Sequence, residues 1–328
     1  MIKLHLKIYS LEITKMKENN NLLESKLESF LNLYWLRPEN GLITTFKSQA
    51  FENFKFQSPS LDLSCGDGMF MAIHLGALFD FDFDYFKSTK ANEFNHSNII
   101  DIYDAFDENY EINYKKKPSI QIDYGTDWKQ SLLDKAEKLD LYKNLVLHDN
   151  NQTPLPFPDN YFKTVYSNSI YWINEPEKLL NDIYRITAPG GLVSLEVLTP
   201  SRYEILYKLE EFMSPQAIEI LDRKRRENTQ GMRKYSEWKE IMENAGFKIK
   251  DVYSVYPHKM IMDFWNIGLR PISHLLIQMS DELNIEKRKR IKEEWVNIFL
   301  ELFKPLLKLN QSYSIENAPY LSFTLEKY

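Results

Sequence analysis

Short apolar runs alternate with helix-like stretches through the middle of the chain, and this alternation constrains the fold more than any other feature. The strand-like runs are PSLDLS (59–64), PSIQID (118–123), NLVLHD (144–149), FKTVYSN (162–168) and GLVSLEVL (191–198). Helix-like stretches stand between them, and one of them, EPEKLLNDIYRIT, ends at APGG, as helices end at glycine with proline nearby. Strands that alternate with helices predict an α/β fold with a doubly wound parallel sheet.

Composition and charge exclude several classes of protein. Hydrophobic residues make up 43% of the 328 residues, which is enough for a packed core. The formal net charge of −6 provides no field for nucleic acid, so no nucleic-acid partner is expected. Charges interrupt every long apolar run, and the first 17 residues make a poor signal peptide, so we expect a cytoplasmic protein without a transmembrane segment. The only cysteine, Cys65, excludes an internal disulfide.

The turn after the first strand-like run, LDLSCGDG (61–68), is the strongest local signal. A dinucleotide-binding turn needs a third glycine, and Met71 stands at that position. The Gly-Lys-Ser/Thr triplet of a phosphate-binding loop is absent as well. Two glycines before a helix N-terminus still allow a close backbone approach to a ligand. The turn therefore favours an adenosine that carries an amino-acid tail over a bound phosphate.

Two stretches together resemble the class I S-adenosylmethionine-dependent methyltransferases. LDLSCGDG is similar to the common first motif LDLGCGxG, with Ser64 in place of the first glycine. Residues 144–197 are similar to the third-strand aspartate, the LPFPD turn, the fourth strand and the R-x-x-x-P-G-G turn of that family. The likeness covers about 60–78 and 118–200, with a fainter echo at 235–255. It implies a seven-stranded Rossmann-like sheet with an antiparallel last strand, and S-adenosyl-L-methionine as cofactor.

The resemblance also implies a set of cofactor-binding residues. Asp62, Ser64, Gly66 and Gly68 would face the methionine end of the cofactor, and Ser167 would join them from the end of the fourth strand. Asp149 and Asn150 would reach the adenine edge. Arg37, in WLRPEN (35–40), would meet the cofactor's carboxylate.

The acid that accepts the ribose hydroxyls has two candidates. Asp84 stands at the ordinary spacing after the glycines, but no helix and strand follow it. Asp123 is followed by both, so we predict that Asp123 binds the ribose and that 79–118 is an insertion between the first helix and the second strand. Asp80, Asp82 and Asp84 alternate but lack the remaining positions of a calcium loop, so no metal site is expected.

The catalytic residues are sought beyond the carboxyl ends of the strands, where ligands bind in an open parallel sheet. Tyr171 follows the fourth strand, and His258 follows the probable sixth. His258 is the best available general base, because its unperturbed pKa is near neutrality. The N-P-P-Y motif of amide and base methylases is absent, since Ser167-Asn168-Ser169-Ile170 stands there, so DNA methylation is not expected.

Three regions follow from this pattern: an N-terminal helical flank (1–58), a cofactor-binding core (59–200, with the insertion 79–118) and a remainder (201–328) that completes the core with 235–256 and 318–328. Within the remainder, the helical segments 201–234 and 259–315 are expected to form a substrate cap rich in aromatics and poor in fixed charges. The basic run 223–226 is expected on a solvated helix face.

We expect methyl transfer to an oxygen or nitrogen of a small or medium acceptor, such as a sugar, a glycan or another secondary metabolite. The alternatives are an inactive methyltransferase-fold binding protein and, less favoured because of Met71, a nicotinamide-dependent oxidoreductase.

Overall fold

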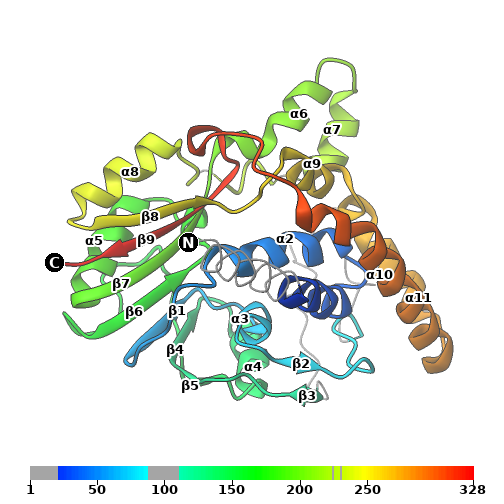
Figure 1. The fold of residues 1–328 in the computed structure, drawn as a ribbon, viewed down its shortest axis with the longest axis horizontal. Helices are drawn as coiled ribbons and strands as arrows, with labels where there is room; N and C mark the ends of the chain where they lie inside the picture. Colours follow the sequence, from blue (N-terminus) through cyan, green and yellow to red (C-terminus); the bar gives the residue numbers. More distant parts are fainter. Residues whose placement is uncertain (1–20, 88–110, 224, 230) are drawn as a thin grey trace, which may run out of the picture.

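A seven-stranded sheet is the main sheet of the molecule, and the helices labelled α10 (Ser273–Asp281) and α11 (Ile285–Phe303) lie to one side of it (Figure 1). The structure is a computed structural model, and it describes residues 21–87, 111–223, 225–229 and 231–328. In space the strands follow the order β5-β4-β1-β6-β7-β9-β8. Their bounds are β1 Ser60–Leu63, β4 Ile122–Asp127, β5 Tyr142–Leu147, β6 Phe162–Ser167, β7 Thr187–Leu198, β8 Lys248–Ser254 and β9 Tyr320–Glu326.

The strand directions confirm the predicted sheet. The strands β5, β4, β1, β6 and β7 run parallel to one another, whereas β9, the last strand of the chain, is antiparallel to both of its neighbours, β7 and β8. The strand order reverses at β1, because the chain first proceeds outward to β4 and β5 and then returns to β6 on the other side. Ligands of open α/β sheets bind beyond the carboxyl ends of the strands at such a reversal.

Helices cover both faces of the sheet, as the burial of its central strands requires. The helix α2 (Pro38–Ala50) covers the face of the sheet on which Glu196 lies. Its Lys47 ammonium is 3.9 Å from the Glu196 carboxylate. On the opposite face, Tyr235 of α8 (Tyr235–Asn244) stacks on Phe323, the ladder partner of Leu195. The helix α5 (Pro176–Ile186) contacts α8, whereas α3 (Met69–His74) contacts α2. The remaining core helix, α4 (Gln130–Lys138), packs on β4 and β5.

The region predicted as an insertion begins and ends in a small second sheet. The strands β2 (Leu78–Phe79) and β3 (Tyr114–Lys116) pair antiparallel, so the chain leaves and returns at one place. The interior of that region, 88–110, lies outside the described residues. Because β4 follows β3 and pairs with β1, the second strand of the parallel sheet begins at Ile122.

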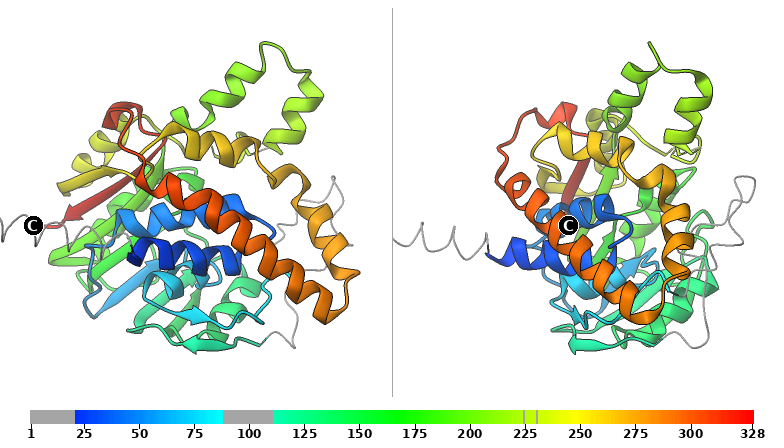
Figure 2. Two further views of the ribbon diagram at one scale, coloured as in Figure 1. Left: turned by 45° about the vertical axis from the view of Figure 1, so that its right-hand side comes forward. Right: turned by 90° about the vertical axis from the view of Figure 1, so that its right-hand side faces the viewer.

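Two helical segments beyond the core contact each other. The helices α6 (Glu204–Leu209) and α7 (Pro215–Asp222) follow β7, whereas α9 (Lys259–Ile267), α10 (Ser273–Asp281) and α11 (Ile285–Phe303) lie between β8 and β9. Both α6 and α7 contact α9, and α9 and α11 contact α2 (Figure 2). Short 3-10 turns are η2 Ile170–Trp172, η3 Pro200–Tyr203, η4 Arg270–Ile272, η5 Lys304–Lys308 and η6 Ile315–Asn317. None of the described helices combines the length and apolar composition that crossing a membrane requires.

Candidate active site

The turn after β1 has the backbone of a ligand-binding loop. Ser64, Gly66 and Gly68 all have positive φ, at 63°, 59° and 75°. A Cβ atom added to Gly66 meets nothing within 4 Å, so the space above this backbone is open. The turn is fixed from the neighbouring strand, because the Cys65 amide donates to the Thr126 carbonyl at 2.7 Å. The loop is thus held in place and open on one side, as close approach of a ligand needs.

Asp127 is the acidic residue that the structure brings to this turn. It ends β4, is buried, and accepts hydrogen bonds from the amides of Gly66 (3.1 Å) and Lys129 (3.0 Å). Burial raises the pKa of its carboxyl group, and the backbone amides oppose that rise only in part. Asp127 therefore stands where a carboxylate at the end of the second strand is expected.

The prediction that Asp123 performs this role is wrong in its placement. Asp123 lies near the beginning of β4, at the opposite end of the strand from the glycine turn. Its carboxylate accepts from the amide and hydroxyl of Ser60 (both 2.9 Å) and pairs with Lys143 at 2.7 Å. Burial would raise the pKa of Asp123, but these hydrogen bonds lower it overall. The sequence pattern predicts a strand that ends at Asp123, whereas the ladder with β5 continues to Asp127.

The loop after β5 meets the glycine turn through Asn150. The Asn150 amide nitrogen donates to the Ser64 hydroxyl at 2.6 Å. Its side-chain oxygen is buried and accepts no hydrogen bond from the described residues. Asp149, one residue earlier, accepts from the Asn151 amide at 2.9 Å and is half-buried. Two predicted site residues therefore lie at the same edge of the sheet as the glycine turn.

Asp62 lies beneath the turn, and its carboxylate accepts a buried hydrogen bond. The Tyr142 hydroxyl donates to the Asp62 carboxylate at 2.6 Å, and burial raises the pKa of Asp62 to about 7. The Tyr142 ring occupies space left by two glycines: a Cβ atom would approach it to 2.9 Å at both Gly68 and Gly125. Gly68 is thus needed for packing below the turn, and Asp62 is paired within the protein.

Ser167 and Tyr171 lie at the carboxyl end of β6, next to the turn after β1. Both side chains are buried. Burial alone would raise the pKa of the Tyr171 phenol, but the positive charges of Lys47, Arg202 and Arg225 outweigh it, so this pKa is lowered from its usual value near 10. The segment after α7 passes close to η2, the short turn that contains Tyr171. A Cβ atom added to Gly231 would meet the Tyr171 carbonyl oxygen at 2.5 Å.

His258 and Arg37 have structural partners in the protein. His258 begins α9, and its Nδ1 accepts the Met260 amide at 3.1 Å. This bond fixes the ring at the start of the helix, and the predicted role of His258 as general base stays a prediction. The buried Arg37 donates to Glu39 at 2.5 Å and to Asn40 at 3.2 Å. Its predicted contact with the cofactor stays a prediction.

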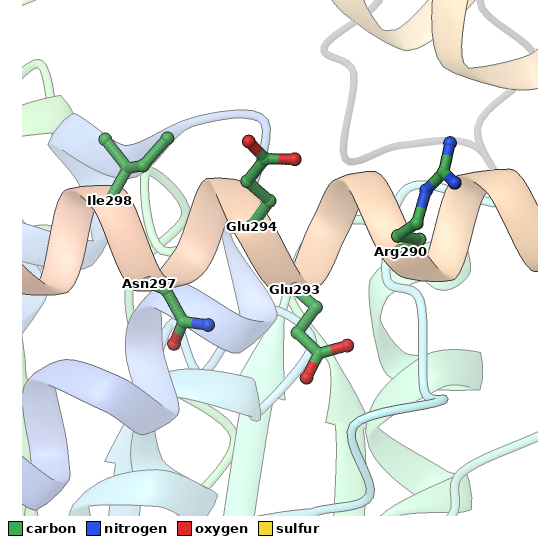
Figure 3. A pocket seen from close by; sticks show the side chains of 5 residues that line it. All are labelled: Arg290, Glu293, Glu294, Asn297 and Ile298. Carbon is green, nitrogen blue, oxygen red and sulfur yellow. The ribbon is translucent and has the colours of Figure 1, made fainter.

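A shallow hollow on α11 does not qualify as the site. Arg290, Glu293, Glu294, Asn297 and Ile298 line it, and all of them are exposed residues of the single helix α11 (Figure 3). Ligand sites bring polar groups together from several elements. The residues at the carboxyl ends of β1, β4, β5 and β6 do so. No group of three or more metal-ligating side chains occurs among the described residues.

Comparisons with known proteins point to one family. A model of the methyltransferase domain matches residues 114–195. A ubiquinone/menaquinone biosynthesis C-methyltransferase from Desulfotalea psychrophila is 23% identical over 139 residues, which are 42% of this chain and 56% of that protein. The match thus spans about half the length of the curated relative.

Solved structures with a similar arrangement include two methyltransferases. One is an S-adenosylmethionine-dependent methyltransferase from Thermotoga maritima, described as a possible histamine N-methyltransferase (TM-score 0.48, 12% identity, 94% of this chain and 99% of that chain). Another is a putative sarcosine dimethylglycine methyltransferase from Galdieria sulphuraria (TM-score 0.45, 12% identity, 88% and 87%). At these scores neither structure assigns a substrate to this chain.

Proposed function

We propose that this chain, a class I S-adenosylmethionine-dependent methyltransferase by its fold and family match, transfers a methyl group to an oxygen or nitrogen atom of a small or medium acceptor. A sugar, a glycan or another secondary metabolite is the class of acceptor we infer. The single observation that carries the proposal is the convergence of the glycine turn, Asp127 and Asn150 at the carboxyl ends of three neighbouring strands.

The residues at this edge fit S-adenosylmethionine. The open space above Gly66 allows a ligand to approach the backbone, and the buried Asn150 oxygen has no donor among the described residues. An unpaired buried acceptor is costly, and a donor from a ligand would satisfy it. Asp127 keeps lone pairs for hydroxyl donors besides the two amides that it accepts.

Each of these residues would contact a different part of the cofactor. Asp127 would accept the ribose hydroxyls, Asp149 and Asn150 would face the adenine, and the backbone of Ser64 and Gly66 would face the methionine end. When bound, the cofactor supplies a methyl group that its sulfonium already activates. The protein's remaining tasks are to position the acceptor and to exclude water.

Tyr171 is the residue we assign to the acceptor's proton. It follows β6, beside the cofactor-binding edge, and the neighbouring cations lower its pKa despite burial. A phenol with a lowered pKa is a better general base at neutral pH than an ordinary tyrosine. As the acceptor oxygen or nitrogen forms its new bond to carbon, its proton would pass to the oxygen of Tyr171 in its ionised, phenolate form.

Calorimetry with S-adenosylmethionine tests the cofactor site. Asp127→Asn keeps one acceptor oxygen for the loop but removes the charge, so it should weaken binding by about 1.5–3 kcal/mol, the range for hydrogen bonds to charged groups. Asp123→Asn is the matched control, since it removes the same charge from the other end of the same strand. Equal losses in both variants would contradict the assignment of Asp127.

Transfer itself is tested with a methyl-labelled cofactor and a small-molecule extract of the host cell. Mass spectrometry should detect a labelled, methylated product with the wild type and lose it with Tyr171→Phe, whose cofactor affinity should be unchanged. If the wild type binds the cofactor but yields no labelled product in such extracts, the alternative of an inactive methyltransferase-fold binding protein would be favoured.

A further inference from the structure

Four arginines from separate segments of the chain meet around one buried indole. The Cζ atoms of Arg202, Arg270 and Arg225 lie 4.2, 4.7 and 5.2 Å from the centre of the Trp265 ring. Arg37 joins them through Asn40, whose side-chain oxygen accepts from both the Trp265 indole (3.0 Å) and Arg37. We call Arg37, Arg202, Arg225 and Arg270 the arginine cluster.

Two members of the cluster, Arg202 and Arg270, form no ion pair with a carboxylate of the described residues. Glu39 pairs with Arg37, and the Asp222 carboxylate pairs with Arg226 at 3.6 Å. Arg270 is 5% exposed and donates to two backbone carbonyls, those of Leu221 (3.3 Å) and Asp222 (2.7 Å).

Arg202 is the least satisfied member of the cluster. It is 6% exposed, and its buried Nε atom has no hydrogen-bond partner among the described residues. A buried charge is retained in proteins only when it is paired or serves a ligand. Burial and the charges of Arg225, Arg37 and Arg202 push the pKa of Arg270 well below its usual value, which again indicates crowded positive charge.

The cluster lies where an acceptor would be held. Arg202 is in η3, directly after β7, and Tyr171 is in η2, directly after the neighbouring β6. Arg202 and Arg225 are both near enough to Tyr171 to lower its pKa. The cluster also opens to solvent on one side, because Arg225 is half-buried and lies 5.3 Å from the ring of Trp172, which is 37% exposed.

We propose that the acceptor carries an oxyanion group, a phosphate or a carboxylate, which binds to Arg202 and Arg270 beside Trp265. This inference rests on the proposed methyl transfer and specifies its substrate class. Guanidinium groups present a planar fork of donors that matches such oxyanions in a bidentate manner. The bound anion would orient the acceptor with its reactive atom toward Tyr171 and the cofactor edge.

The test measures binding of inorganic phosphate and of acetate to the full chain by calorimetry, at constant ionic strength against chloride. The wild type should bind at least one of them saturably. Arg202→Gln should abolish this binding, and Arg202→Lys, which keeps the charge but not the fork, should weaken it about 10-fold. Arg290→Gln, an exposed arginine on α11, removes the same charge and should leave the affinity within about twofold.

Other outcomes would overturn the proposal. The first is that neither anion binds saturably, and the second is that Arg290→Gln loses as much anion affinity as Arg202→Gln. The third is that phosphate competes with S-adenosylmethionine, which would assign the arginines to the cofactor's own carboxylate. Tighter binding of phosphate or of acetate agrees with the proposal and identifies the group on the acceptor. Cofactor titrations of the same samples separate this result from the proposed function, because Arg202→Gln should bind S-adenosylmethionine as the wild type does.

Discussion

At the scale of single residues, Glu196 shows how one buried carboxyl group affects stability. It lies near the carboxyl end of β7, fully buried, and neither carboxylate oxygen accepts a hydrogen bond from the described residues. The nearest cation, the Lys47 ammonium, is 3.9 Å away. Burial therefore dominates and raises the pKa of Glu196 from 4.5 to about 7, although Lys47 lowers it in part.

This pKa predicts a pH dependence of folding stability. Between about pH 4.5 and 7 the folded state keeps the Glu196 proton while the unfolded chain releases it. The folded state then binds more protons, so the free energy of unfolding falls as the pH rises through this window, by up to about 3 kcal/mol from this group. Denaturant unfolding at pH 5, 6, 7 and 8 should show that the free energy of unfolding falls less with rising pH in Glu196→Gln than in the wild type.

The exposed Glu293→Gln is the control and should retain the wild-type slope. Asp62, with a pKa also near 7, contributes to the slope in both proteins, so the difference between variants isolates Glu196. Parallel slopes in the wild type and Glu196→Gln would show that Glu196 does not titrate as described.

Residue roles were predictable from the sequence only where the local motif fixes them. The glycine turn and Asn150 lie together as the motif implies, because both follow directly after strands. The sequence pattern did not place Asp127 at the end of the second strand, although Asp127 ends the run IDYGTD three residues before α4 begins. Two aspartates lie on this one strand, and only the ladder with β5 shows which of them reaches the carboxyl end.

At the scale of elements, α11 binds the start of the insertion to the rest of the molecule. Its Arg288 donates to Asp84 at 2.6 Å, and its Lys292 donates to the carbonyl oxygens of Phe81 (2.9 Å) and Phe83 (2.7 Å). Asp84 also accepts from the Trp35 indole at 3.0 Å. The acidic stretch at 80–84 is therefore not solvated throughout, since Asp84 is almost fully buried.

Breaking this contact should destabilise the whole fold. Asp84→Ala leaves the buried Arg288 without its main partner, and we expect a loss of about 3–5 kcal/mol in the free energy of unfolding. Asp82→Ala is the matched control, because Asp82 pairs with Lys289 at the surface, with more than half of each side chain exposed. It should cost less than about 1 kcal/mol. Similar losses for the two variants in urea unfolding would contradict the contact between α11 and Asp84.

The basic run 223–226 shows why some elements could not be predicted. It was expected on a solvated helix face, but α7 ends at Asp222 and Arg223 has a positive φ of 49°. Arg225 then turns toward Trp172 and Trp265. Partners about 50 residues earlier and 40 residues later in the chain decide this arrangement, and no local pattern records them.

At the scale of the whole molecule, the cap differs in character from the expected aromatic lining. Tyr207 and Phe212 are 50% and 75% exposed, so they do not line a buried pocket, and arginines surround Trp265. The second cap segment is also part of the core. Trp265 and Phe303 are buried, and α9 and α11 contact α2, so replacing 259–315 by a short linker would remove structural support together with any acceptor site.

Hydrogen exchange should locate the cofactor site within the whole molecule. S-adenosylmethionine at about 100 times its Kd should slow exchange of locally opening amides in 64–68, 127–129 and 148–151 by up to about 100-fold. Segment 204–222, which includes the exposed residues of α6 and α7, should change little. Protection confined to 120–124 would instead restore Asp123 as the ribose ligand.

The ring of Tyr142 lies where side chains of residues 68 and 125 would otherwise be, and this links three distant positions in the history of the sequence. A relative that gains a side chain at either glycine position must also have a smaller residue at 142, and room beside Leu139 (2.8 Å from the Cβ position of Gly68) or Leu145 (3.0 Å from that of Gly125). Loss of the tyrosine hydroxyl in turn leaves the buried carboxylate of Asp62 without its donor, which favours a neutral residue there. Positions 62, 68, 125 and 142 are therefore expected to change together over evolution, so that exchanging any one of them alone between relatives would fail.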